Sequence, residues 1–266
     1  MQLYHRKIGE GTPIIIVHGL YGMSENWLSI AKKLASDFTV YMVDVRNHGQ
    51  SPHCSVHNYK AIADDLFEFI EKNNIQTPHF IGHSMGGKAV IQFASQFPEK
   101  INKLVVVDIS PLKIKTSNIS GDLNHRTILK KMCEINFSNI LTRNDFDEYF
   151  KNDFNDLRTI GFMMKNLKKS DINPFTWKLN VDALYENIDN ISAGVPLSFN
   201  NKIETNTLFL KAENSNYIGI DEMKEIDRIF VNYQIKTING AGHWIHVDKP
   251  EECAKLIQNF LFLQIE

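Results

Sequence analysis

The sequence predicts an α/β protein whose mostly parallel, doubly wound sheet is interrupted by a helical insertion. Short apolar segments alternate with amphipathic helical patterns through the first 111 residues, and the same alternation returns from residue 202. Residues 112–201 give helix-like patterns only. Connections of this length inside a compact domain usually carry function. We therefore expect an α/β core formed by residues 1–111 and 202–266, with residues 112–201 forming a helical cap, or lid.

Six short segments are predicted to be strands of one sheet. They are rich in β-branched residues and apolar at successive positions, as expected when helices cover both faces of a parallel sheet. Because helical patterns separate them, consecutive strands should be joined by right-handed crossovers. The segments are residues 13–17, 38–43, 79–82, 103–107, 207–210 and 233–238.

Helices are predicted between these strands, where apolar residues recur at helical spacing. Asn58 is expected to cap the second helix, and Pro98 to end the third. Core helices are expected near residues 27–34, 62–70, 90–97, 222–230 and 251–263. Cap helices are expected near residues 123–137, 146–160 and 177–188, with no strand in the cap.

The composition favours an ordinary globular enzyme. The 266 residues are 43% hydrophobic and 23% charged, with a net charge of −2, which points to neither nucleic acid nor an anionic membrane surface. No apolar run approaches the ~20 residues that span a bilayer, and we see no signal peptide at the N-terminus. Three widely spaced cysteines suggest a reducing compartment without a zinc site. A cytoplasmic location is expected.

A candidate nucleophile lies in the segment GHSMG, residues 82–86, which matches the G-x-S-x-G pattern. The segment directly follows a predicted strand and directly precedes a predicted helix, where this motif exposes its serine on a strained turn. Glycines are needed on either side because larger side chains would collide with the turning strand and helix. The alternative is a glycine-rich turn without chemistry. We predict that Ser84 is the nucleophile.

The segment HGLYG, residues 18–22, is expected to form an oxyanion hole together with the start of the helix after Ser84. The predicted donors are the backbone N–H groups of Leu20 and Met85. The His18 side chain is expected to brace this turn rather than to react. Arg46, in the loop after the next strand, is expected to hold loops together through charge-assisted hydrogen bonds.

The candidate base is His243, which lies in a glycine-flanked loop after the last predicted strand. Ligands of α/β sheets bind at the carboxyl ends of strands, so this loop is well placed. His246 is a competitor three residues later, and a plain surface histidine is the alternative reading of His243. His83, beside the serine, is expected to line the pocket with its side chain directed away from Ser84.

These segments, in this order and spacing, resemble those of α/β-hydrolases. The longer strings VDVRNHGQS, FIGHSMGGKAV, KLVVVDISP and GAGHWIHVDKP resemble the bacterial YbfF-type esterases, and the resemblance covers nearly the whole chain. It implies a small cytoplasmic serine hydrolase with a helical cap, which acts on short acyl esters and acyl-CoA thioesters. The family's oxyanion-hole, nucleophile and histidine positions fall on Leu20, Met85, Ser84 and His243.

The acid partner of the histidine is not where most α/β-hydrolases carry it. After residues 207–210 the expected aspartate position is occupied by Ser215. Asp108 ends the strand after the serine turn, and adjacent strands lie ~4.8 Å apart, so its carboxylate could reach the same imidazole. The resemblance to the YbfF-type esterases implies the same arrangement, with the acid at this position and a serine at the usual one. We assign the acid to Asp108, with Glu213 second, and Ser215 to an auxiliary role in the His243 network. The alternatives are a turn-forming aspartate and a loop hydroxyl.

The predicted function is hydrolysis of short-chain acyl esters or thioesters through an acyl-enzyme on Ser84, without metal or organic cofactor. A lyase or C–C hydrolase of the same fold is the first alternative. The resemblance implies that such enzymes keep an aspartate where this chain has Ser215, which argues against this alternative. A non-catalytic binding module is the second. The oligomeric state is not predicted.

Three features of charge and composition complete the expectations. Most aromatic and Met side chains of the cap should form its core, and some should cover Ser84. The cluster Lys165, Lys168 and Lys169 is interpreted as a solvated face rather than a binding site for coenzyme A phosphates. Lys88, just inside the helix after Ser84, is expected to form a structural ion pair.

Overall fold

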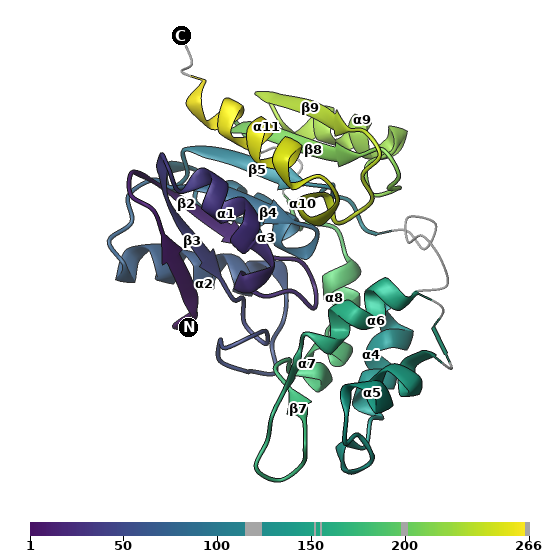
Figure 1. Ribbon diagram of the computed structural model, residues 1–266. Helices are drawn as coiled ribbons and strands as arrows, with labels where there is room; N and C mark the ends of the chain where they lie inside the picture. Colours follow the sequence, from purple (N-terminus) through teal and green to yellow (C-terminus); the bar gives the residue numbers. More distant parts are fainter. Residues whose placement is uncertain (115–123, 152, 155, 198–201, 264–266) are drawn as a thin grey trace.

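The structure is a computed structural model that describes residues 1–266 except 115–123, 152, 155, 198–201 and 264–266 (Figure 1). A seven-stranded sheet forms its centre, in the order β1-β3-β2-β4-β5-β8-β9. All neighbouring pairs are parallel except β1–β3. The strands are β1 (His5–Ile8), β2 (Thr12–Val17), β3 (Phe38–Val43), β4 (His79–His83), β5 (Lys103–Val107), β8 (Asn206–Ala212) and β9 (Tyr233–Ile238). The predicted parallel sheet is confirmed.

Helices cover both faces of this sheet. Along β2, Ile15 and Val17 belong to one hydrophobic cluster, while Ile14 and Ile16 belong to another, so alternate side chains enter opposite layers. This explains why the strands are apolar at successive positions. Helices α2 (Tyr59–Lys72), α3 (Met85–Gln96) and α9 (Ile220–Ile229) contribute to the first layer, and α1 (Leu28–Leu34) and α11 (Pro250–Phe262) to the second.

The segment between β5 and β8 forms a separate group of helices below the core in Figure 1. These are α4 (His125–Cys133), α5 (Arg143–Lys151), α6 (Leu157–Met164), α7 (Val181–Glu186) and α8 (Ile188–Ser192). Phe146 and Phe150 are fully buried, and the Phe146 ring meets Trp177 edge-on at 5.6 Å. The aromatic side chains thus pack mainly with one another inside the cap.

The cap departs from the sequence prediction in two ways. The helix expected over residues 146–160 is divided into α5 and α6, and Asp156 caps the second by accepting from the N–H groups of Arg158 and Thr159. No strand was expected, but β6 (Leu167–Lys168) and β7 (Thr176–Trp177) form a short antiparallel ladder. Two residues are too few to give an alternating pattern in the sequence.

The antiparallel strand β1 was also not predicted, because its sequence HRKI contains a single apolar residue. Other local predictions are confirmed. The Asn58 side chain accepts from the N–H of Ala61 at 2.9 Å, which caps α2. Arg46 pairs with Asp65 at 2.6 Å and donates to the carbonyl oxygens of Val56 in the loop and Ala61 in α2. No helix within the described ranges combines the length and apolarity that crossing a bilayer requires.

The expected ion pair of Lys88 is wrong for the part of the chain that the structure describes. Lys88 is fully buried, and its Nζ donates to the carbonyl oxygen of Ala193 at 2.7 Å, where α8 leaves the cap. The ammonium also lies 5.7 Å from the centroid of the Tyr59 ring. A backbone carbonyl just after α8 and an aromatic face replace the carboxylate, and Lys88 connects the core to the end of the cap.

Burial lowers the pKa of Lys88 to about 7, far below its usual 10.5. Between these values the unfolded chain binds the proton that the folded protein releases, so the free energy of unfolding should rise with pH through this window. We expect Lys88→Met to remove this rise. Urea unfolding from about pH 7 to about pH 10 measures it, with exposed Lys168→Met as the control. Parallel stability curves for the wild type and Lys88→Met would contradict the assignment.

Candidate active site

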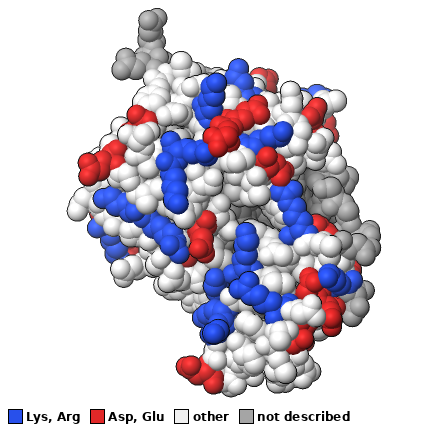
Figure 2. All heavy atoms as spheres, viewed as in Figure 1, with Lys and Arg blue, Asp and Glu red and all other residues white. Residues whose placement is uncertain are grey.

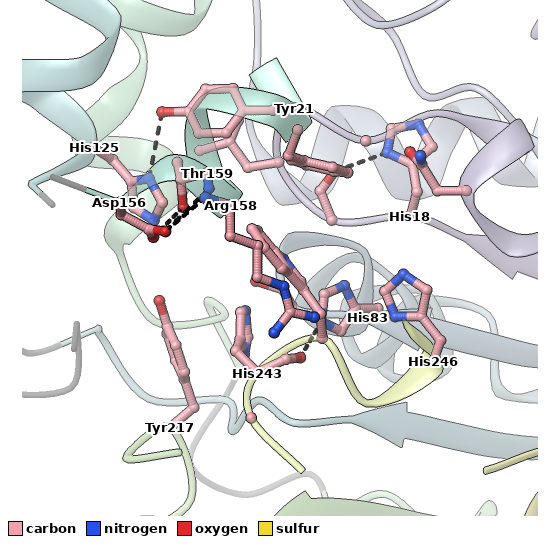
Figure 3. Close-up of a pocket in the computed structure, with 18 of the residues that line it drawn as sticks. His18, Tyr21, His83, His125, Asp156, Arg158, Thr159, Tyr217, His243 and His246 are labelled. Carbon is pink, nitrogen blue, oxygen red and sulfur yellow. Dashed lines mark hydrogen bonds between the residues drawn. The ribbon is translucent and has the colours of Figure 1, made fainter. Parts of the chain in front are cut away.

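A cavity of ≈ 260 Å³ lies where the core meets the cap (Figure 3). Its walls come from segments far apart in the sequence, including the loop after β2, the end of β4, the cap helices α4 and α6, and the loops after β8 and β9. Among the predicted site residues, Leu20, Ser84 and His243 line it directly. Asp108 lies behind His243 and is fully buried.

Ser84 stands on a strained turn between β4 and α3. Its backbone has φ 53° and ψ −120°, and its N–H donates to the carbonyl of Val107 on the neighbouring strand at 3.1 Å. A Cβ on Gly82 would lie 2.5 Å from the Gly86 carbonyl oxygen, and one on Gly86 would lie 2.3 Å from that of Val17. Real Cβ atoms do not approach backbone this closely. The two glycines therefore have the steric role that the motif requires.

Asp108 forms a three-way contact beneath the cavity. Its Oδ2 lies 2.8 Å from His243 Nδ1 and accepts from the Ser215 hydroxyl at 2.5 Å, while Oδ1 accepts from the N–H of Ala212 at 2.9 Å. Asp108 has φ +49°, and its N–H is bonded to Leu210 on β8. Glu213, the second candidate, is exposed and accepts from the N–H of Gly240 instead. The carboxylate that reaches His243 is therefore that of Asp108.

Two of the other histidines that line the cavity, His83 and His246, lie next to the His243 loop. The His83 ring nitrogen Nε2 donates to the carbonyl of His243 at 2.9 Å. His246 stacks on Trp27, with ring centroids 4.4 Å apart. Burial lowers the pKa of His246 to about 3 and that of His83 well below its usual value, so both rings are neutral. His83 lines the cavity as expected.

The loop with Leu20 is braced by two buried, neutral histidines. His18 Nδ1 donates to the carbonyl of Gly19 at 2.8 Å, and its Nε2 accepts from the N–H of Val45 at 3.1 Å. His48 Nε2 accepts from the N–H of Tyr21 at 3.3 Å, and Tyr21 has φ +63°. Burial lowers the pKa of both rings. Met85 begins α3, so its N–H lies at the positive end of the helix beside Ser84.

Three residues around His243 were not identified from the sequence. The Tyr217 ring stacks on His243 at 4.1 Å, the Tyr21 hydroxyl bonds to His125 from the cap, and Arg158 lies over Trp244. Figure 3 shows His125, Tyr217 and Arg158 around His243. Tyr217 follows a strand end and could have been noticed there. His125 and Arg158 have no such signal, because only tertiary packing brings the cap to the cavity.

The site offers no metal centre within the described ranges, where no group of three or more His, Cys, Asp or Glu side chains could hold an ion. Its polar groups are instead a strained serine, a histidine joined to a buried carboxylate, and backbone N–H groups on a braced loop. This set is suited to nucleophilic acyl transfer.

Known proteins resemble this chain along most of its length. A family profile for the alpha/beta hydrolase fold matches residues 12–250. Esterase YbfF of Escherichia coli (strain K12) is 30% identical over 94% of this chain and 93% of its own. The sn-1-specific diacylglycerol lipase ABHD11 of Danio rerio is 33% identical over 95% of this chain and 79% of its own.

Solved structures are also similar. One described as a marine microorganism esterase has a TM-score of 0.92 and 37% sequence identity, covering 97% of this chain and 99% of that chain. The profile and the relatives each span nearly the whole chain, core and cap together. The chain therefore belongs to the alpha/beta hydrolase fold family.

Proposed function

We propose that the protein is a serine hydrolase that cleaves short-chain acyl esters or acyl thioesters through an acyl-enzyme on Ser84. The observation that carries this proposal is the hydrogen bond of 2.8 Å between His243 Nδ1 and the buried Asp108, in a loop that lines the same cavity as Ser84. With Nδ1 bonded to the carboxylate, Nε2 is the nitrogen that remains to accept a proton.

In the proposed mechanism, His243 Nε2 takes the proton of the Ser84 hydroxyl as its oxygen attacks the acyl carbonyl. The N–H groups of Leu20 and Met85 stabilise the oxyanion. The imidazolium then gives the proton to the leaving alcohol or thiol, and Asp108 stabilises its positive charge. Water, activated by the same histidine, releases the acid and restores Ser84. Ser215 orients Asp108 through its hydroxyl.

The substrate class is supported by the relatives and by the cavity. The relatives' names include an esterase and a diacylglycerol lipase. The cavity of ≈ 260 Å³ is small, which favours short acyl groups, and its wall includes apolar side chains such as Leu20, Ile128 and Phe162. For a lyase or C–C hydrolase, and for a non-catalytic module, we find no observation that favours them over ester hydrolysis.

Partitioning of the acyl group tests the proposal. If all substrates pass through one butyryl-enzyme, then p-nitrophenyl butyrate, phenyl butyrate and a butyryl thioester should give the same ratio of butyrate to butyryl hydroxamate when hydroxylamine is added. The ratio is measured by chromatography of the products. A ratio that changes with the leaving group would exclude the common intermediate. If none of the three substrates were turned over, ester hydrolysis itself would be contradicted.

A further inference from the structure

A second cavity of ≈ 770 Å³ adjoins the first. The two share the lining residues Asn26, Arg158, Phe162, Trp244 and His246. A molecule whose reacting group lies beside Ser84 can therefore extend past Arg158 into the larger space. Its other walls come from the segment after β2 in the core and from α5, α6 and the residue after β7 in the cap.

The lining of this second cavity is strongly basic. Arg143, Arg158, Lys165 and Lys178 contribute to it, against a single carboxylate, that of Glu25. Arg158 already pairs with Asp248. Within the described residues, no ion pair neutralises the other three cations. Three positive charges therefore face one negative charge around a single hollow.

Several basic side chains elsewhere in the cap have a nearby carboxylate as partner. The pairs are Arg126–Asp189, Lys130–Glu134, Lys131–Asp153 and Lys151–Asp147. The cavity cations instead come from three separate segments, beginning with Arg143 at the start of α5 and ending with Lys178 after β7. Figure 2 shows this face hollowed between core and cap, with several Lys and Arg side chains around the hollow. A solvated face gives no reason for basic side chains from separate segments to gather around one hollow.

A buried polar side chain, His246, lies in the wall that the two cavities share. His246 lines both cavities, only 6% of it is exposed, and its Nδ1 has no hydrogen-bond partner among the described residues. Buried polar atoms are nearly always bonded, so an unpartnered one needs an explanation. The ring is neutral, because burial lowers its pKa to about 3, and a neutral imidazole can donate one hydrogen bond.

We infer that the second cavity binds an anionic group, a phosphate or a carboxylate, on the part of the substrate that extends beyond Arg158. Arg143, Lys165 and Lys178 supply positive charge that no ion pair among the described residues neutralises, and His246 lies in the wall that the two cavities share. This inference rests on the proposed function, because it specifies the substrate of the same site. It gives Lys165 a role other than the solvated face expected from the sequence. All three lysines are exposed, but Lys165 lines the cavity and Lys168 and Lys169 do not.

Matched substrate pairs test the inference. One pair is S-acetyl-4′-phosphopantetheine and S-acetylpantetheine, which differ in one phosphate group, and the other is a p-nitrophenyl hemiglutarate and its methyl ester, which differ in a carboxylate. We expect a higher kcat/KM for the anionic member of at least one pair. In the double variant Arg143→Gln, Lys165→Gln the ratio of kcat/KM values should fall about tenfold, and in the wild type it should fall with added salt.

The control is the double variant Lys168→Gln, Lys169→Gln, which removes the same charge from the cap outside the cavity and should leave the ratio unchanged. Equal responses of the two double variants would overturn the inference, as would the absence of any preference in both pairs. A preference confined to one pair identifies the group as phosphate or carboxylate.

Measurements of ligand binding test this inference independently of the proposed function. Calorimetry with 4′-phosphopantetheine against pantetheine, and with glutarate against its monomethyl ester, needs no turnover. Tighter binding of an anionic probe that the Arg143→Gln, Lys165→Gln protein loses would support the anion site even if every ester were inert. If the protein hydrolysed esters but showed no preference for anionic probes in rate or binding, the anion site would be ruled out and the proposed function would stand.

Discussion

Ser84→Ala is expected to lower the kcat for p-nitrophenyl acetate and butyrate by about 10⁶-fold, to the level that binding and the oxyanion hole alone can sustain. The methyl group leaves the strained turn intact, because Ser84 makes no side-chain cap bond at the start of α3. The loss should therefore appear in the rate and not in the fold. Initial rates measured with purified protein, alongside thermal unfolding, provide both readouts.

The exposed serine Ser36, at the other side of the core, offers a matched control. Ser36→Ala should retain full activity and the same melting temperature. If Ser84→Ala turned over either ester at a rate comparable to the wild type, the acyl-enzyme mechanism on this residue would be ruled out.

Asp108→Asn is expected to lower kcat by about 10⁴-fold. The carboxylate accepts hydrogen bonds from His243, Ser215 and Ala212, and it is fully buried. An amide presents one acceptor oxygen in place of two and carries no charge, so it cannot both satisfy these donors and stabilise an imidazolium. The histidine should lose its orientation and its preferred tautomer.

Ser215→Ala is the comparison that tests the order of importance. It removes one hydrogen bond to a charged group, which is worth about 1.5–3 kcal/mol, while the carboxylate keeps Ala212 and His243 as partners. A loss of roughly tenfold to a hundredfold in kcat should result. Measuring kcat for both variants over a range of pH settles the ranking. A larger loss in Ser215→Ala than in Asp108→Asn would move the acid role away from Asp108.

The sheet was predictable because its strands are buried on both faces. Segments such as Ile14–Ile16 are apolar at every position because both of their faces are buried. Such a continuous apolar run can be recognised in the sequence even when it is short. Strand β1 pairs only at the edge of the sheet and is half exposed, so its sequence carries no such requirement. The same argument explains the two-residue ladder of the cap.

The core half of the candidate site could also be inferred, because each residue sits at the end of a recognisable strand. Ser84, Asp108 and His243 follow β4, β5 and β9. The cap half could not. Arg158 and His125 reach the cavity only because α4 and α6 fold over it, and the spacing of residues within a helix says nothing about which distant loop the helix will cover. The basic lining of the second cavity was missed for the same reason.

The loop after β8 supplies no carboxylate to His243, whose partner is Asp108, and this matters for engineering. It supplies Asn214 and Tyr217 to the cavity wall, while the carboxylate stays on β5, anchored by the bond between the Asp108 N–H and Leu210. A library of variants at Asn214 would sample new wall shapes without moving that carboxylate. Directed evolution of substrate range has its natural starting point in this loop.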